Sequence, residues 1–328
     1  MCAILRDMPL WLTEEDVRAV LAMRAVMQAM ERALAAFSAG EVVQPVRTAF
    51  ELRERTFFGL MPAFDGAQGI LGAKLVSVIP GNAERALPTH LAAISLFDPL
   101  TGELTAVMDG RLITEMRTAA VSAISTKYLA RPGARVLAIL GSGVQARSHL
   151  EAMKLAGPFA EIRAWSPTAA HLRKFVEEAG EGVAAAGSAE DAVRGADVVV
   201  LATSSLTPAI DNAWVGAGAH VISIGACRPS QRELAPELVA RALLVVDSRD
   251  AARRESGDVV QGIREGRFTA DNAALELGDV IAGRAAGRTR EDQVTVFKSL
   301  GLAIEDLAAA GMAWRKAVET GRGLRVEF

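Results

Sequence analysis

The sequence predicts a protein of the α/β class, built from a doubly wound parallel sheet and a separate α+β domain. The chain has 328 residues, which is too long for one ordinary hydrophobic core, so two domains are expected. Hydrophobic residues make up 51% of it and aromatic residues only 5%, an aliphatic bias that suits a parallel sheet buried on both faces. From residue 131 onward, short apolar runs alternate with helical stretches, as they do in such a sheet.

The first 106 residues predict one long helix followed by hairpins. Thr13 precedes three acidic residues, which is an N-cap pattern, and apolar residues then recur at helical spacing through Phe37, with Gly40 closing the helix. Residues 42–106 consist of short apolar runs cut by Pro and Gly, which predict an antiparallel or mixed sheet. Within it, DPLTGE at residues 98–103 is a hairpin turn signal.

A helix is predicted over residues 114–130, and the domain boundary is placed directly after it. The first domain is expected to span residues 1–130, joined by a C-terminal helix of about 300–328, and the second residues 131–299. The second domain contains five predicted strands: RVLAIL (135–140), EIRAW (161–165), DVVVLAT (197–203), HVISIGA (220–226) and LLVVDS (243–248). Residues 297–318 have the pattern of an amphipathic helix, which by its position could fold back onto the first domain.

A glycine motif follows the first of these strands. Gly141-x-Gly143-x-x-Ala146 lies between the strand and a helix, which is the context that a dinucleotide-binding fingerprint requires. Gly141 allows the tight turn, Gly143 the close approach of the pyrophosphate, and Ala146 close packing of helix on strand. The helix N-terminus then offers N–H groups to the phosphates. The motif predicts a Rossmann domain that binds a nicotinamide dinucleotide; a glycine turn in a ligand-free α/β domain is the alternative.

The end of the second strand indicates which dinucleotide is bound. NAD-selective sites usually place Asp or Glu there, to accept from the ribose hydroxyls. This chain has Ser166, Pro167 and Thr168, with Arg173 further along. Since no carboxylate would repel a 2′-phosphate, NADP is the preferred cofactor and NAD the alternative.

Three cations of the first half have unusual surroundings. Lys74 lies in the middle of an apolar strand and Arg117 in an Ala-rich helix, where an unpaired charge is costly to bury, and Arg47 lies in QPVRT. A substrate carboxylate would be a suitable partner, since Arg binds carboxylates through two parallel hydrogen bonds. Pairing with structural Asp or Glu side chains is the equal alternative on pattern alone.

At these residues the chain resembles the ornithine cyclodeaminase/mu-crystallin family. The matching motifs span nearly the whole chain in order: PVRT (45–48), MPAF (61–64), GAKLVSVIPGN (72–82), DG (109–110), RTAAVSA (117–123), GSGVQARSH (141–149), GACRPSQREL (225–234), ELGDVIAGR (276–284) and VFKSLGLAIED (296–306).

The resemblance implies NAD(P)-dependent chemistry on amino acids or cyclic imino acids, and a homodimer joined through the first domain. It also implies that Arg47, Lys74 and Arg117 hold the substrate carboxylate near the nicotinamide, and we predict them as the catalytic residues. The predicted substrate site also includes Met61 and Thr89. The predicted cofactor site consists of Gly141, Gly143, Val144, Gln145, Ser166, Thr168, Thr203 and Gly225.

The predicted reaction is reduction of a C=N bond in a small imino acid. Family members that are cyclodeaminases carry an Asp where this chain has Cys227, which argues against ornithine cyclodeamination. An ammonia lyase with catalytic NAD and a non-catalytic NADPH-dependent binding protein remain the alternatives. Asp279 is predicted either to orient ligand groups or to cap a following helix.

Charge and composition exclude other classes. The net charge of -3 and the absence of a basic stripe argue against nucleic-acid binding, and no apolar stretch approaches a membrane span. Met1–Leu12 lacks the pattern of a signal peptide, and two distant cysteines suit a reducing cytoplasm. The four histidines, which show no metal-ligand spacing, are predicted to have structural or surface roles and no metal is expected: His90, His149, His171 and His220.

Overall fold

The computed structural model describes residues 8–327, so Cys2 and the start of the Met1–Leu12 segment lie outside the described residues. The chain divides into two compact units, one of residues up to Arg117 and from Leu302 onward, the other of Thr118–Gly301. The division falls inside helix α3 (Arg111–Leu129) rather than at residue 130. The second half of α3 belongs to the second unit because its Ser122 and Ser125 hydrogen-bond His149 and His220, which are buried there.

The first unit contains a mixed sheet whose strand order is β16-β1-β7-β6-β5-β4-β2, with β3 paired to β4. Its strands are β1 (Leu10–Leu12), β2 (Val42–Val43), β3 (Thr48–Arg53), β4 (Thr56–Asp65), β5 (Ile70–Val78), β6 (His90–Phe97), β7 (Leu104–Asp109) and β16 (Leu324–Arg325). The predicted turn joins β6 to β7, and the Asp98 carboxylate accepts from the N–H groups of Leu100 and Thr101. The sequence prediction of hairpins over residues 42–106 is confirmed.

The predicted N-terminal helix is two helices, α1 (Glu14–Val20) and α2 (Met23–Ser38). Thr13 caps α1 as predicted, through a capping box with Asp16. Leu21 and Ala22 take extended backbone conformations between the helices. Leu21, in this break, and Met23, directly after it, are both buried, and no Pro or Gly in the sequence marks the break.

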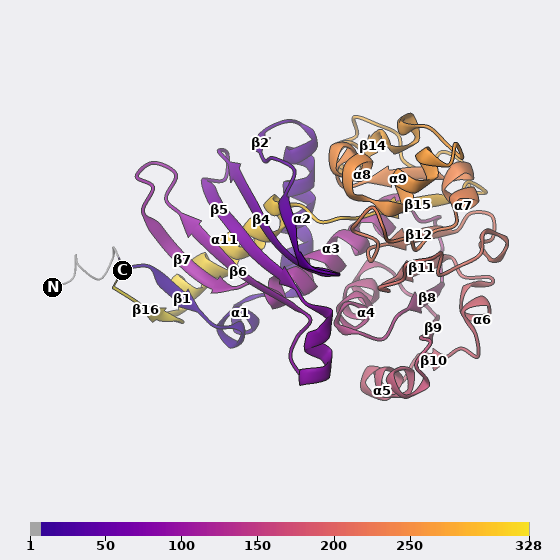
Figure 1. Ribbon diagram of the computed structural model, residues 1–328, viewed down its shortest axis with the longest axis horizontal. Coiled ribbons are helices and arrows are strands. Elements are labelled where there is room, and N and C mark those ends of the chain that lie inside the picture. Colours follow the sequence, from indigo (N-terminus) through magenta and orange to yellow (C-terminus); the bar gives the residue numbers. More distant parts are fainter. Residues whose placement is uncertain (1–7, 328) are drawn as a thin grey trace. The chain divides into compact units, whose positions relative to one another are not determined.

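One face of this sheet is buried and carries the first unit's core. Directly paired residues point to the same face, and the row that crosses the strands at Lys74 is buried throughout: Leu12, Met61, Lys74, Ile94 and Met108. Helix α11 (Ala303–Thr320) packs against β4, β5 and β6 and against α2. Figure 1 shows α11, coloured yellow, lying along this sheet.

The second unit contains a sheet of eight parallel strands in the order β10-β9-β8-β11-β12-β15-β13-β14. The strands are β8 (Val136–Leu140), β9 (Glu161–Trp165), β10 (Val183–Ala185), β11 (Val198–Leu201), β12 (His220–Ser223), β13 (Leu243–Val246), β14 (Leu275–Glu276) and β15 (Thr295–Lys298). Every residue of β11, β12 and β15 is buried, so both sheet faces are covered. The predicted doubly wound α/β fold is confirmed.

The helices of this unit pack on that sheet. Residues of α6, α7, α8 and α9 join alternate strand residues such as Leu140, Leu201 and Val246 in one apolar cluster. The helices are α4 (Val144–Ala156), α5 (Ala169–Ala179), α6 (Ala189–Val193), α7 (Pro236–Arg241), α8 (Arg249–Glu255), α9 (Gly257–Arg264) and α10 (Leu277–Ile281). Short 3₁₀ helices in the chain are η2 (Pro80–Arg85), η3 (Asn212–Trp214) and η4 (Ala270–Ala273).

Strand β15 corrects the prediction for the C-terminal tail. It inserts between β12 and β13, parallel to both, so the predicted helix does not begin at Phe297; α11 begins at Ala303. The run VTVF at residues 294–297 consists of three β-branched residues and one aromatic residue, which is a strand signal. The short strands β10 and β14 were not predicted either.

Candidate functional site

The glycine turn lies where an open α/β sheet binds its ligand. Strand β8 has β9 on one side and β11 on the other, so the strand order reverses there, and ligands bind outside the carboxyl ends of strands at such a point. Gly141 follows β8 with a φ of +121°, and a Cβ on it would lie 2.3 Å from the Ala202 carbonyl oxygen. Only glycine fits this position, because both the backbone conformation and the contact exclude a side chain.

The residues around Gly143 fit a bound pyrophosphate. Gly143 is the N-cap of α4 and no side chain caps the helix there. A Cβ on Gly143 would meet no atom within 4 Å, so the backbone is open to a ligand on that side. Gln145, in the first turn of α4, has a buried side-chain oxygen with no hydrogen-bond partner among the described residues; as an acceptor, this oxygen does not itself bind a phosphate. Ala146 is fully buried, which permits close packing of α4.

The end of β9 carries hydroxyl groups. Ser166 is buried, and its Oγ accepts a hydrogen bond of 2.9 Å from Ser142 in the glycine turn. Thr168 is exposed and is the N-cap of α5, without a side-chain capping bond. Val144, in the first turn of α4, is also exposed. Ser166 and Ser142 are therefore polar groups at the turn, Thr168 begins the next helix, and residues 166–168 include no carboxylate.

Thr203 and Gly225 follow β11 and β12, and one buried carboxylate joins them. Glu233 Oε1 accepts from the Thr203 N–H (2.8 Å) and Oγ–H (2.7 Å), and Glu233 Oε2 accepts from the Gly225 N–H (2.7 Å). Sequence reasoning missed Glu233, although it lies in the GACRPSQREL motif. The signal that could have found it is an acidic residue directly after the polar run RPSQR, in a segment that follows a predicted strand end.

The structure brings Lys74 and Arg117 together in the first unit. Lys74 Nζ pairs with Asp306 Oδ2 and hydrogen-bonds Thr114 Oγ1 at 3.4 Å. Arg117 binds Asp306 Oδ1 through Nε at 3.0 Å and Glu305 Oε2 through Nη1 at 2.8 Å. All four charged side chains are almost fully buried. The alternative that these cations pair with structural acids therefore holds for both, and Asp306 bridges them.

Burial sets the protonation behaviour of this cluster. It lowers the pKa of Lys74 to about 8, and Arg117 and Arg47 act in the same direction, while Asp306 opposes them. Burial would raise the pKa of Asp306, but Arg117 and Lys74 hold it below its ordinary value. Lys74 can thus gain or lose a proton near neutral pH while Asp306 stays ionised.

The remaining predicted substrate residues lie at different depths. Met61 is buried directly opposite Lys74 on β4. Arg47 precedes β3, is half-buried, and its charge acts on Lys74. Thr89 is exposed, and its carbonyl oxygen accepts from the Ile79 N–H at 2.8 Å. The charge of Arg47 and the pairing of Met61 thus bring both residues close to Lys74, while Thr89 directly precedes β6.

His90 lies near the charged cluster of Lys74 and Arg117, and the sequence did not reveal this. It begins β6, on the sheet face that carries Lys74. Burial lowers its pKa to about 4, and Lys74 and Arg117 add to the effect. His90 is therefore neutral at physiological pH, in contrast with its charged neighbours. The strand register that places it there is invisible in the sequence, because it depends on pairing between strands.

The other predicted polar residues have structural contacts. Cys227 is half-buried and its thiol donates to the Ile224 carbonyl at 3.2 Å. His149 and His220 are buried and hydrogen-bonded as structural residues, as predicted, and burial lowers the pKa of each, to about 4 and about 3. His171 is exposed. Among residues 8–327, no three His, Cys, Asp or Glu side chains gather as metal ligands.

Asp279 does not have the predicted role of a helix cap. It lies inside α10, whose N-cap is Glu276, so it does not cap that helix. Its carboxylate pairs with Arg249 at 3.0 Å and with Arg284 at 2.9 Å. The two arginines bind different oxygens of this carboxylate, so Asp279 joins them in one ion-pair cluster.

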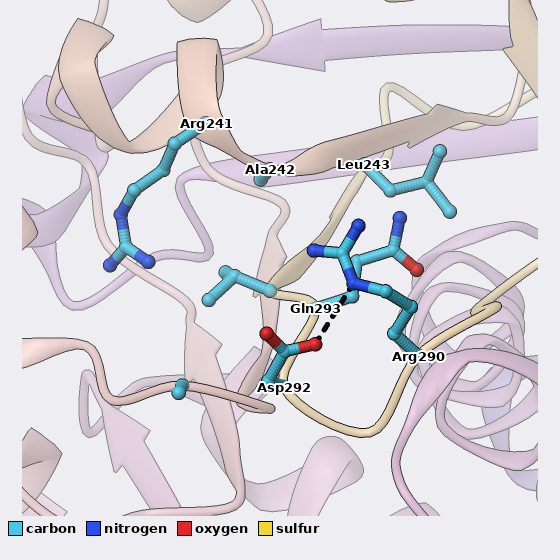
Figure 2. A pocket seen from close by; sticks show the side chains of 8 residues that line it. Arg241, Ala242, Leu243, Arg290, Asp292 and Gln293 are labelled. Carbon is cyan, nitrogen blue, oxygen red and sulfur yellow. Dashed lines mark hydrogen bonds and ion pairs between the residues drawn. The ribbon is translucent and has the colours of Figure 1, made fainter.

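A pocket of about 420 Å³ lies at the opposite edge of the parallel sheet. Its lining comes from the amino ends of β12, β13 and β15: Ala217, Arg241, Ala242, Leu243, Arg290, Asp292, Gln293 and Val294. Figure 2 shows Arg290 directed to Asp292, with which it pairs at 3.0 Å. Arg241 donates to Asn212 and to the Val215 carbonyl. This pocket contains none of the predicted site residues.

The parallel sheet with its glycine turn defines a dinucleotide-binding protein of the Rossmann type, with a second α+β unit that buries paired cations. The chain belongs to the ornithine cyclodeaminase/mu-crystallin family, whose model matches residues 8–321, and the predicted resemblance is confirmed.

Several oxidoreductases are similar to nearly the whole chain. It is 42% identical to the ketimine reductase mu-crystallin of Rattus norvegicus over 315 residues, 94% of this chain and 98% of that protein. The structure of Δ1-pyrroline-2-carboxylate reductase of Thermococcus litoralis with NADH and L-proline is 35% identical, with a TM-score of 0.94, covering 97% and 100% of the two chains. An archaeal alanine dehydrogenase dimer with bound NAD is 34% identical, with a TM-score of 0.93, covering 98% and 99%.

Proposed function

We propose that this protein is an NAD(P)H-dependent oxidoreductase that reduces the C=N bond of small imino acids and, in reverse, oxidises the matching amino acids. The observation that carries this proposal is the buried Lys74, held beside Arg117 by Asp306 in a chain that also has a dinucleotide turn. The relatives support it, since their names include a ketimine reductase, a pyrroline-2-carboxylate reductase and an alanine dehydrogenase.

Arg47 and Arg117 are proposed to bind the substrate carboxylate. A guanidinium has five N–H donors, so Arg117 can serve its two acidic neighbours and a ligand. Asp306 and Glu305 fix the direction of the Arg117 side chain, and rigid supporting contacts of this kind are what a binding residue needs. Holding the carboxylate places the imine carbon in one position, which lowers the barrier by orientation.

Lys74 is proposed to supply the proton of the reaction. A bound reduced nicotinamide provides a hydride for the imine carbon. The Lys74 ammonium gives its proton to the imine nitrogen, so that C=N becomes CH–NH and Lys74 is left neutral. Its lowered pKa of about 8 suits this step, because proton donors work best with a pKa near the working pH.

NADP is the proposed preferred cofactor. Support comes from the end of β9, where Ser166 and Thr168 offer hydroxyl groups and residues 166–168 include no carboxylate that would repel a 2′-phosphate. NAD remains the alternative, and two similar structures hold NADH or NAD. The ratio of specificity constants for NADPH and NADH decides between them.

A homodimer is proposed through the outer face of the first unit's sheet. Four large apolar side chains on that face are exposed in the single chain: Phe50, Leu60, Leu75 and Leu91. Apolar side chains grouped in this way often mark an interface. No helix within residues 8–327 is long and apolar enough to cross a membrane. The cytoplasm is the proposed location, on the basis of the cysteine pattern.

The test is a panel of cyclic imino acids with NADPH and NADH, followed by the nicotinamide absorbance. We expect oxidation of the cofactor with carboxylate-bearing imines, and much slower oxidation with the matching imines that lack the carboxylate. Ammonia release from a diamino acid without net absorbance change would instead identify a cyclodeaminase. Tight dinucleotide binding with no turnover of any imine would identify a binding protein.

A further inference from the structure

Glu233 is a buried carboxylate whose four hydrogen bonds all come from the ends of neighbouring strands. Besides the three bonds from Thr203 and Gly225, its Oε2 accepts from Ser223 Oγ at 2.8 Å. Two of the four donors are backbone N–H groups, which can donate a hydrogen bond but cannot accept one. The ionised carboxylate can accept all four of these bonds, because its two oxygens have only acceptor sites.

This carboxylate is held in turn by a buried ionic network. Glu233, Asp258 and Lys298 are each at most 1% exposed. Lys298 Nζ lies 3.2 Å from Asp258 Oδ2 and donates to Ser223 Oγ at 3.0 Å. Asp258 Oδ1 accepts from the backbone N–H of Glu233 at 2.8 Å. The network joins β12, β15 and α9 to the segment that carries Glu233.

Keeping a charge in this network opposes the natural effect of burial. The pKa of Glu233 is raised above its ordinary value: burial is the largest cause and Asp258 adds to it, while Lys298, Thr203 and Ser223 act in the opposite direction. An apolar residue of similar volume would often be at least as stable as such a buried ionic group. Burying these charges therefore costs free energy, and the stability of the fold alone does not explain why the chain has them.

Close contacts extend from this network to the glycine turn. A Cβ on Gly225 would lie 1.8 Å from the Thr203 carbonyl oxygen and 2.5 Å from Glu233 Oε1, so the two strand ends touch where Glu233 joins them. On the other side, the turn at Gly141 packs against the Ala202 carbonyl. Contacts thus run without a gap along the carboxyl ends of β8, β11 and β12, which are adjacent strands.

We infer that Glu233 is a positioning residue for the dinucleotide: its carboxylate fixes the Thr203 and Gly225 loops at the spacing that the cofactor requires. This inference rests on the proposed function, because it takes these loops as part of the cofactor site. The two loops follow the strands on one side of the β8 reversal, and the adenosine-side hydroxyls of Ser142 and Ser166 lie on the other. Glu233 itself contacts only protein.

The variant Glu233→Gln tests the inference with little change in shape. Its amide nitrogen must face either the Thr203 N–H or the Gly225 N–H, whichever way the amide turns, so one loop loses its bond. We expect the dissociation constant for NADPH or NADH to rise at least about tenfold, as measured by protein fluorescence. Amide hydrogen exchange should become faster at Thr203 or Gly225. The KM for the dinucleotide should rise, while kcat at saturating dinucleotide and the KM for the imino acid stay within about twofold.

Asp247→Asn is the matched control. Asp247 is also fully buried, and its Oδ2 accepts from Ser299 Oγ, from the Leu300 N–H (2.5 Å) and from the Gly301 N–H (2.7 Å). It lies after β13, away from the glycine turn in the strand order. We expect this variant to lower the melting temperature but to bind dinucleotide within twofold of wild type per folded molecule.

The outcomes separate the inference from the proposed function. If the wild type binds no dinucleotide, the proposed function itself fails. If the wild type binds it and folded Glu233→Gln binds it equally well, only the positioning role is overturned. Should Glu233→Gln not fold, Ser223→Ala removes the bridge from Lys298 to Glu233 while sparing both backbone bonds. An affinity loss of a few fold supports the role in that variant, and an unchanged affinity contradicts it.

Discussion

At Lys74, burial and ion pairing have opposite effects on the pKa of the ammonium group. The side chain is 1% exposed in the middle of β5, where an ammonium without a partner would not remain charged. Asp306 supplies the partner, yet the pKa of Lys74 is still lowered to about 8 because burial is the largest effect and two guanidinium groups add to it. The residue is thus built to exchange a proton near neutral pH.

This arrangement predicts a pH dependence whose direction differs between the two reaction directions. Imine reduction needs the ammonium form, so its kcat should be constant below pH 8 and fall above it. Amino-acid oxidation needs the neutral amine, so its kcat should rise through the same range. The neighbouring groups do not titrate there, since His90 has a pKa of about 4 and that of Asp306 is lowered. Initial rates at saturating substrates, from pH 6 to 10, give the profile.

Lys74→Arg is the control for this profile. Arginine keeps the charge opposite Asp306 but does not release its proton below about pH 12. We expect the reduction rate to fall by roughly 10²- to 10⁴-fold, the usual contribution of general acid catalysis, and the limb near pH 8 to vanish. A variant that retained this limb would assign it to another group.

Arg47 offers the clearest test of carboxylate binding. It is half-buried, so replacing it disturbs packing less than replacing Arg117 does. Arg47→Met should lower kcat/KM for the imino acid by about one to two powers of ten, which corresponds to a charged contact of about 1.5–3 kcal/mol. The melting temperature and the NADPH dissociation constant should stay near their wild-type values. Equal losses in stability and activity would instead assign Arg47 a structural role.

Arg117→Met should behave differently. It leaves Glu305 and Asp306 buried with one cation fewer, and breaking a buried pair costs about 3–5 kcal/mol. We therefore expect a lower melting temperature together with lost imine reduction. The sequence suggested either a ligand role or a structural one, and the structure shows that the acids pair with it. Charges in apolar surroundings are visible in a sequence, but a partner 189 residues away is not.

At the scale of elements, the glycine turn was the most predictable part of the site. Strand, spacing and helix all follow from one short segment, because the contacts that shape the turn are mostly local. Elements that depend on distant pairing were harder to predict. Strand β15 is one example, since its place between β12 and β13 is set by strands about 50 to 75 residues earlier.

The two glycines of this turn predict opposite results for two small substitutions. Gly143 has a φ of -83°, which any residue can adopt, and open space where a Cβ would lie. Gly143→Val should therefore keep its melting temperature and lose dinucleotide binding, because the side chain fills the place of the pyrophosphate. Gly141→Ala should lower the melting temperature, because its φ of +121° and the Ala202 carbonyl exclude a Cβ. Thermal unfolding and NADPH titration of both variants check this. Undiminished binding by Gly143→Val would remove the turn from the cofactor site.

At the scale of the whole molecule, the division of the chain could be predicted only approximately. The composition change at residue 130 marks where helix α3 ends, whereas the structure divides inside that helix. A boundary inside a continuous helix leaves no Pro, Gly or polar signal. Buried hydrogen bonds such as that of Ser125 with His220 decide which unit each half joins, and they link residues that are 95 positions apart.

The assembly prediction concerns the open face of the first unit's sheet. Leu75 points to this face and is 43% exposed in the single chain, although it is large and apolar. On the opposite face, Met61, Lys74 and Ile94 of the same strands are buried and face the core, so the core does not need an apolar residue at Leu75. If a second copy covers this face, a charge at its centre would be buried on association, which is costly.

The wild type should then have twice the chain mass in light scattering, and Leu75→Glu should have the mass of one chain with its melting transition still cooperative. Leu100→Glu, in the β6–β7 turn and 93% exposed, is the control and should leave the mass unchanged. A wild type with the mass of one chain, or a Leu75→Glu variant that remains a dimer, would place the apolar face outside any interface between copies.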